Sequence, residues 1–156
     1  MIECHKMTKE LLRDAFALLS EFLSQDEYYL DSSQMYGDGG SMALQNALEL
    51  FLQRPELGLV WMAYDSNKPV GICVVSFAIS TSIGAVVAKL DDVFVATGRQ
   101  NQGIGSILLA SLKKELRELG VRRIDTSVHF QNNQARHFYS KHNFCSLSEE
   151  RLSCLL

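Results

Sequence analysis

The sequence predicts an α/β domain in which strands, some of them antiparallel, alternate with helices. Three observations predict it: apolar runs typical of buried strands, apolar residues at helical spacing, and a glycine turn between one strand and one helix. With 156 residues, of which 47% are hydrophobic, the chain is long enough for one full core. No repeat or linker interrupts these segments, so residues 1–156 are expected to form a single domain.

The first part of the chain is expected to begin with a strand near residues 2–7. Apolar residues at helical spacing from 11 to 23 predict a helix, for which Thr8 is a suitable N-cap. Residues 25–41 are polar and contain three glycines and three tyrosines, so a loop is expected there. A shorter amphipathic helix is predicted at residues 42–52.

Three strands are predicted in the middle of the chain, at residues 59–64, 70–79 and 86–95, with the third antiparallel to the second. Residues 69–88 carry no charge, and such a run is long enough to cross a bilayer. Its serines, glycines and β-branched residues instead favour two strands joined by a turn, so no membrane span is expected.

The clearest helix is predicted at residues 103–119, where a stripe of apolar residues ends just before Gly120. A strand at residues 123–128, a helix at 132–142 and a final strand at 144–156 are expected to follow. These segments complete the alternation of strands and helices.

Composition excludes some classes of function. The net charge of -3 lacks the basic surface of a nucleic-acid-binding protein, so no nucleic acid is expected as a partner. The four cysteines are scattered, form no Cys-x-x-Cys pair and follow no segment resembling a signal peptide. A cytoplasmic protein with free thiols is therefore expected.

The charge is unevenly distributed along the chain. Residues 1–92 contain 13 acidic and 6 basic residues, whereas residues 93–156 contain 5 acidic and 9 basic residues. Between Arg13 and Arg54 there are seven acids and no Lys or Arg, which predicts a local field that attracts a cation. A solvated acidic face is the alternative interpretation.

The strongest chemical motif is the glycine turn Gln100-Asn101-Gln102-Gly103-Ile104-Gly105-Ser106, which precedes the clearest helix. The first N–H groups of a helix have no intrahelical partners, so glycines that let a ligand approach them can form a phosphate site. The turn lacks the lysine of a P-loop and the third glycine of a dinucleotide fingerprint. A strand-to-helix turn without a ligand is the alternative.

A second motif lies further along the chain as Asn132-x-x-Ala135-x-x-Phe138-Tyr139, followed by Lys141-His142-Asn143-Phe144. Together with Gln100-x-x-Gly103-x-Gly105, it resembles the GNAT superfamily of acyl-CoA-dependent N-acetyltransferases over residues 59–145. The strand Leu90-Asp91-Asp92-Val93-Phe94-Val95 looks like that of polyamine-type and aminoglycoside-type small-amine acetyltransferases. The family often has basic residues before the glycines, whereas Gln100-Asn101-Gln102 is neutral here.

The resemblance implies a mixed, mostly antiparallel central sheet flanked by helices, with two splayed central strands that hold acetyl-CoA. It implies that the following residues bind this co-substrate: Val93, Phe94, Val95, Gln100, Asn101, Gln102, Gly103, Ile104, Gly105, Ser106, Asn132 and Tyr139. Tyr139 also stands where the resemblance implies the general acid that protonates the departing coenzyme A thiolate. A core aromatic is the alternative role for Tyr139.

Acetyl transfer to an amine also needs a proton acceptor, because alkyl amines with a pKa near 10.4 are mostly protonated at neutral pH. The adjacent Asp91 and Asp92 are the candidates for this role. Neighbouring strand residues point to opposite faces, so only one of the two is expected to face the site. We expect Asp92 to share the face of Phe94, and Asp91 that of Val93 and Val95.

The sequence thus predicts an N-acetyltransferase that moves acetyl from acetyl-CoA directly to a primary amine of a small cationic molecule. Acetylation of protein N-termini or lysines, and a non-catalytic acyl-CoA binding module, are the alternatives. His137 and His142 are five residues apart and do not share a helix face, so no metal is expected and both are assigned to the surface or an interface. A homodimer is left open.

Overall fold

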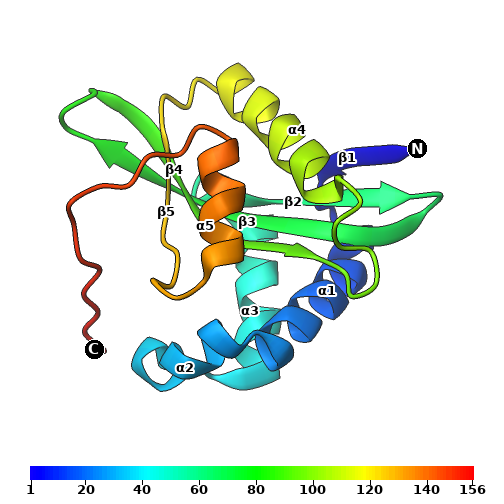
Figure 1. Cartoon of the computed structure of the whole chain (residues 1–156). Helices are drawn as coiled ribbons and strands as arrows, with labels where there is room; N and C mark the ends of the chain where they lie inside the picture. The colour runs from blue at the N-terminus through cyan, green and yellow to red at the C-terminus, as the bar shows by residue number, and fades with distance from the viewer.

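The computed structural model covers residues 1–156 and describes all side chains except those of residues 32–36. Five strands form one sheet in the order of the chain, and Figure 1 shows helices on both faces of it. The strands are β1 (Ile2–Lys6), β2 (Gly58–Asp65), β3 (Lys68–Ser80), β4 (Ala85–Val95) and β5 (Ile124–Thr126). The pairs from β1 to β4 are antiparallel and β4 pairs with β5 in parallel, which confirms the predicted mixed, mostly antiparallel sheet.

The helices divide between the two faces of the sheet (Figure 1). They are the 3-10 helix η1 (Lys9–Leu11), α1 (Leu12–Gln25), α2 (Glu27–Tyr36), α3 (Gly40–Gln53), α4 (Ile104–Glu118) and α5 (Asn133–Lys141). Side chains of α4 pack with Val75 and Leu90 in one core, which we call the α4-side core. Side chains of α1 and α3 pack with Met62 and Ile72 in the second, which we call the α1-side core. No helix among the described residues is long and apolar enough to cross a bilayer.

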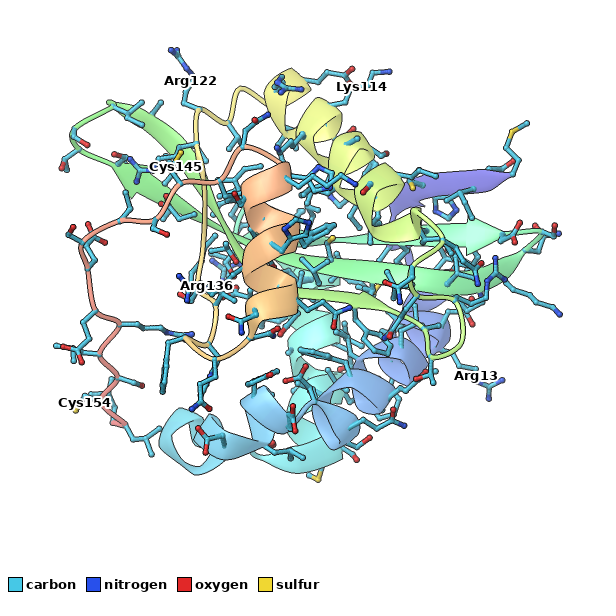
Figure 2. All side chains as sticks on the ribbon, in the orientation of Figure 1. Arg13, Lys114, Arg122, Arg136, Cys145 and Cys154 are labelled. Atoms are coloured by element: carbon cyan, nitrogen blue, oxygen red, sulfur yellow. The ribbon has the colours of Figure 1, made fainter. Side chains whose placement is uncertain are left out.

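Two expectations from the sequence are wrong. Residues 27–36 form α2 rather than a loop, and the carboxylate of Asp26 accepts a hydrogen bond from the Tyr29 N–H at 2.7 Å, as an N-cap does. Residues 144–156 form no strand. Figure 2 shows Cys145 and Cys154 far apart along this segment, and all four cysteines are free thiols.

The register of β4 shifts by one residue at Asp91. Leu90 pairs with Val75 and Asp92 pairs with Val74, so Asp91 is an extra residue, a β-bulge. Leu90 and Val93 both contact the α4-side core although they are three positions apart. Asp91 and Asp92 therefore both lie on the opposite, α1-side face of the sheet.

This bulge corrects the expected placement of the two acids. Strict alternation would put Asp91 on the face of Val93, but the extra residue puts it on the same face as Asp92 and Phe94. The expected face of Asp92 is right and that of Asp91 is wrong.

Candidate active site

The site begins where β4 and β5 separate. Pairing between them covers only residues 88–90 of β4 and all three residues of β5, whereas β4 continues to Val95. We call the β5-facing side of residues 91–95 the open edge. The Ala96 N–H donates to the Val70 carbonyl, and alternation along an antiparallel ladder then turns the backbone groups of Val93 and Val95 away from β3. The N–H and C=O groups of these two valines therefore point to the open edge.

Tyr139 of α5 lies at the start of the open edge. Its neighbours include Thr126, the last residue of β5, which donates through Oγ1 to the Leu90 carbonyl at 2.9 Å. The Tyr139 ring makes edge contacts with Phe138 and Phe144 at centroid distances of 5.4 and 5.2 Å. Burial raises the pKa of Tyr139 to about 12, so its hydroxyl keeps its proton throughout the neutral range.

Asp92 is the carboxylate whose charge reaches Tyr139. Burial raises the pKa of Asp92 to about 6, and the negative charges of Asp91 and Asp26 add to this effect. Lys89 and Arg151 act in the opposite direction. No described side chain hydrogen-bonds to Asp92, so its carboxylate is available as a proton acceptor near neutral pH.

Asp91 is already occupied by two partners. Its carboxylate accepts a hydrogen bond from the Ser76 hydroxyl at 2.7 Å and forms an ion pair with the Lys89 ammonium at 3.0 Å. Asp92 thus lies within electrostatic range of Tyr139, and Asp91 lies next to Asp92 as a source of negative charge.

The glycine turn forms an open helix start. Gly103 is the residue before α4 and has a φ of +80°, and a Cβ added to it would meet no atom within 4 Å. The first bond of the turn runs from the Ile107 N–H to the Gly103 carbonyl, so the N–H groups of residues 104–106 have no intrahelical partner. These three N–H groups, at the positive end of the helix dipole and with open space at Gly103, can donate to an anion. We call the three groups the anion cradle.

Of the remaining predicted cofactor residues, Gln100, Asn101 and Gln102 lie in the turn before α4, and Asn132 lies at the start of α5. Gln100 donates from Nε2 to the Val95 carbonyl at 3.3 Å, and Gln102 donates to the Gly98 carbonyl at 3.2 Å. Asn101 has a φ of +60°, which shapes the turn. Asn132 caps α5 by accepting a hydrogen bond from the Ala135 N–H at 3.0 Å. Residues 100–106 carry no cation, and Arg99 just before them donates from Nε to the Gln102 side chain at 3.3 Å.

Sequence reasoning missed His142 as a member of this site. Its Nε2 lies 3.0 Å from the hydroxyl of Ser106, one of the three cradle residues. The two residues are 36 positions apart, and no local pattern in the sequence connects them.

The seven acids between Arg13 and Arg54 are largely part of the local structure. Asp14 accepts from the Tyr64 hydroxyl, Glu21 from the Thr97 N–H and Asp38 from the Gly40 N–H. Asp31 lies 3.2 Å from the His129 ring nitrogen. Asp26 is the member of this group whose charge also acts on Asp92. These contacts explain most of the acidic run without a ligand.

The sequence matches the family described as acetyltransferase (GNAT) over residues 12–144. Because this match spans most of the chain, the protein belongs to the GNAT acetyltransferase family. No curated protein matches the sequence.

Several solved structures share the fold. A probable acetyltransferase is 22% identical, with a TM-score of 0.79 and 99% of this chain and 97% of that chain covered. The aminoglycoside N-acetyltransferase AAC(6')-Iy in complex with CoA is 15% identical, with a TM-score of 0.78 and coverage of 99% and 95%. A ribosomal-protein-alanine N-acetyltransferase from Brucella melitensis biovar Abortus 2308 is 12% identical, with a TM-score of 0.75 and coverage of 99% and 100%.

Proposed function

We propose that the protein is an acetyl-CoA-dependent N-acetyltransferase that passes acetyl directly to the primary amine of a small cationic molecule. The observation that carries this proposal is that Asp92, a buried carboxyl on β4, lies within electrostatic range of Tyr139, in a chain that also has an open helix start at Gly103. A binding module without catalysis would need neither group there.

The residues present fit a coenzyme A thioester. The cradle offers three backbone N–H groups and open space to a pyrophosphate. The backbone groups of Val93 and Val95 offer a donor and an acceptor to an extended amide chain, which would replace the Gln100 side chain at the Val95 carbonyl. Acetyl-CoA supplies an acetyl group activated as a thioester.

Asp92 and Tyr139 divide the proton transfers between them. Asp92, ionised above about pH 6, accepts a proton from the acceptor ammonium directly or through a water. Tyr139 keeps its proton and donates it to the sulfur as negative charge develops there. Proximity of the bound amine to the thioester supplies a further part of the rate.

Binding of acetyl-CoA through the cradle is tested with Gly103→Val. In the parent protein, millimolar acetyl-CoA is expected to raise the thermal midpoint, because a ligand that binds only the folded state stabilises it. Gly103→Val should abolish this shift, since a side chain would stand where the phosphate approaches. The measurement is a thermal melt with and without acetyl-CoA.

Gly120→Val is the matched control for this test. Gly120 has a φ of +78° and open space for a Cβ, so it carries the same backbone strain at the opposite end of α4. Gly120→Val should lower the thermal midpoint but keep the rise in midpoint that acetyl-CoA causes. If acetyl-CoA does not shift the thermal midpoint of the parent, the proposed function is contradicted. If it shifts the midpoints of Gly103→Val and Gly120→Val equally, the cradle is not the binding site.

The acceptor class is tested by a panel of amines, with release of coenzyme A thiol as the readout. A cationic polyamine or aminoglycoside is expected to be the best acceptor, ahead of neutral amines and of peptides with a free N-terminus. Its KM should rise with salt at saturating acetyl-CoA, because the screening length falls from about 10 Å at 0.1 M to about 3 Å at 1 M.

Two double variants distinguish the effect of the acids near the site from the effect of the total charge of the protein. Asp26→Asn with Glu27→Gln should raise this KM and leave kcat nearly unchanged, and asparagine retains the N-cap of α2. Glu3→Gln with Glu56→Gln removes the same charge from exposed positions outside the acidic run that do not act on Asp92, and should leave the KM unchanged. If the best acceptor is a neutral amine whose KM is unchanged by salt and by either double variant, the proposal of a cationic acceptor is refuted.

A further inference from the structure

His142 lies beside the anion cradle although it belongs to another element. It follows α5, and its Nε2 is 3.0 Å from the Ser106 hydroxyl. The backbone N–H of Ser106 is one of the three that form the cradle. A single hydroxyl group therefore separates the imidazole from the place proposed for the pyrophosphate.

The ring of His142 is held in this position from two sides. It packs on the Phe138 ring at a centroid distance of 4.7 Å, and its backbone N–H bonds to the carbonyls of Phe138 and Tyr139. Its own carbonyl accepts a hydrogen bond from the Lys113 ammonium at 2.6 Å. Contacts with both α4 and α5 thus fix the imidazole toward Ser106.

The charged groups that face His142 are both cationic. Lys113 approaches from α4 and Lys141 from α5, and together with burial they lower the pKa of His142. The ring is therefore mainly neutral at pH 7 without a ligand. In that form its Nε2 can accept the single proton of the Ser106 hydroxyl, which is then not offered to a ligand.

We propose that His142 is a positioning residue of the cofactor site, which takes up a proton when acetyl-CoA binds and thereby turns the Ser106 hydroxyl toward the pyrophosphate. The proton comes from the solvent, so that Nε2–H donates to the Ser106 oxygen and the hydroxyl donates to a phosphate oxygen. The negative phosphates offset the repulsion from Lys113 and Lys141 and favour the imidazolium. This inference rests on the proposed function.

The proposal also accounts for the neutral turn at residues 100–102. Side-chain cations are missing from residues 100–106, and an imidazolium behind Ser106 supplies one positive charge from outside the turn. Bound phosphates favour this charge, which the two lysines disfavour in their absence.

The test measures protons taken up on binding of acetyl-CoA, by calorimetry at pH 7 in two buffers with different ionisation enthalpies. The parent protein should take up protons, and His142→Gln should lose this uptake because glutamine can donate to Ser106 but cannot titrate. The Kd of the parent should weaken from pH 6 to pH 8, relative to His142→Gln, by up to about tenfold, the limit for a pKa change of one unit.

Two further variants make the test specific. Ser106→Ala removes the hydroxyl but keeps the cradle N–H, and it should reduce the proton uptake even if His142→Gln folds poorly. His137→Gln, at an exposed position of α5, should behave as the parent. Coenzyme A has a phosphate monoester that titrates near pH 6 in every variant, so only differences between variants count.

The outcomes distinguish the two proposals. Equal proton uptake in the parent, His142→Gln and Ser106→Ala would overturn the role of His142 and leave acetyl-CoA binding intact. A parent that binds no acetyl-CoA would overturn the proposed function, and the inference with it.

Discussion

Replacement of Tyr139 by phenylalanine is expected to lower kcat by about ten- to a thousandfold, the range typical for loss of a general acid. The ring remains, so its contacts with Phe138 and Phe144 are kept and stability should change little. The affinity for acetyl-CoA should also stay near that of the parent, because the cradle is untouched. Steady-state kinetics and a thermal melt measure both effects.

Tyr64→Phe is the matched control for a lost tyrosine hydroxyl. The Tyr64 hydroxyl donates to Asp14 at 2.9 Å, away from the open edge, so its loss should lower stability and leave kcat unchanged. An unchanged kcat in Tyr139→Phe, with no burst of product before the steady state, would assign Tyr139 to the core alone.

The second large effect is expected from Asp92→Asn, which should lower kcat/KM by at least about tenfold above pH 7. In the parent, kcat/KM should fall as the pH drops through about 6, where Asp92 becomes protonated. The variant should lose this acid limb. Asp91→Asn is the control: it should keep most of the activity and move the limb to lower pH, because Asp91 helps to raise the pKa of Asp92.

Asp92→Asn should also be more stable than the parent, by an amount that depends on pH. The pKa of Asp92 is about 6 in the folded protein against a usual 3.8, so folding favours the protonated form. The contribution of the Asp92 carboxyl to the free energy of unfolding is complete below about pH 4 and is lost as the pH rises through 6. Asp92→Asn should therefore raise the thermal midpoint at pH 8 and leave it unchanged at pH 4. A lower midpoint at pH 8 would show that Asp92 is a structural residue.

Local patterns in the sequence predicted the parts of the fold that depend on local forces. The stripe of leucines and isoleucines before Gly120 defines α4 without reference to the sheet, and the glycine turn marks its start. The serines, glycines and β-branched residues of the uncharged stretch predicted the β3–β4 hairpin. Each of these signals lies within about 15 residues of the structure that it determines.

The features that the sequence did not predict depend on partners distant in the chain. The weak apolar pattern of residues 27–36 gave no sign of α2, which the Asp26 cap helps to start. The apolar residues at 144–156 suggested a strand, but a strand also needs an edge to pair with, and β5 has only three residues. The bulge at Asp91 exists only in the register with β3, and the contact between Ser106 and His142 joins two helices.

The bulge has a consequence for how this strand can change. Upstream of it the even-numbered Ala88 and Leu90 fill the α4-side core, and downstream the odd-numbered Val93 and Val95 do. Deletion of Asp91 would restore strict alternation and keep these side chains on their present faces, because Leu90 and Asp92 already pair with the consecutive residues Val75 and Val74. The core therefore does not require the inserted residue: β4 could lose Asp91 and stay packed on both sides of it, and what would be lost is the second carboxylate beside Asp92.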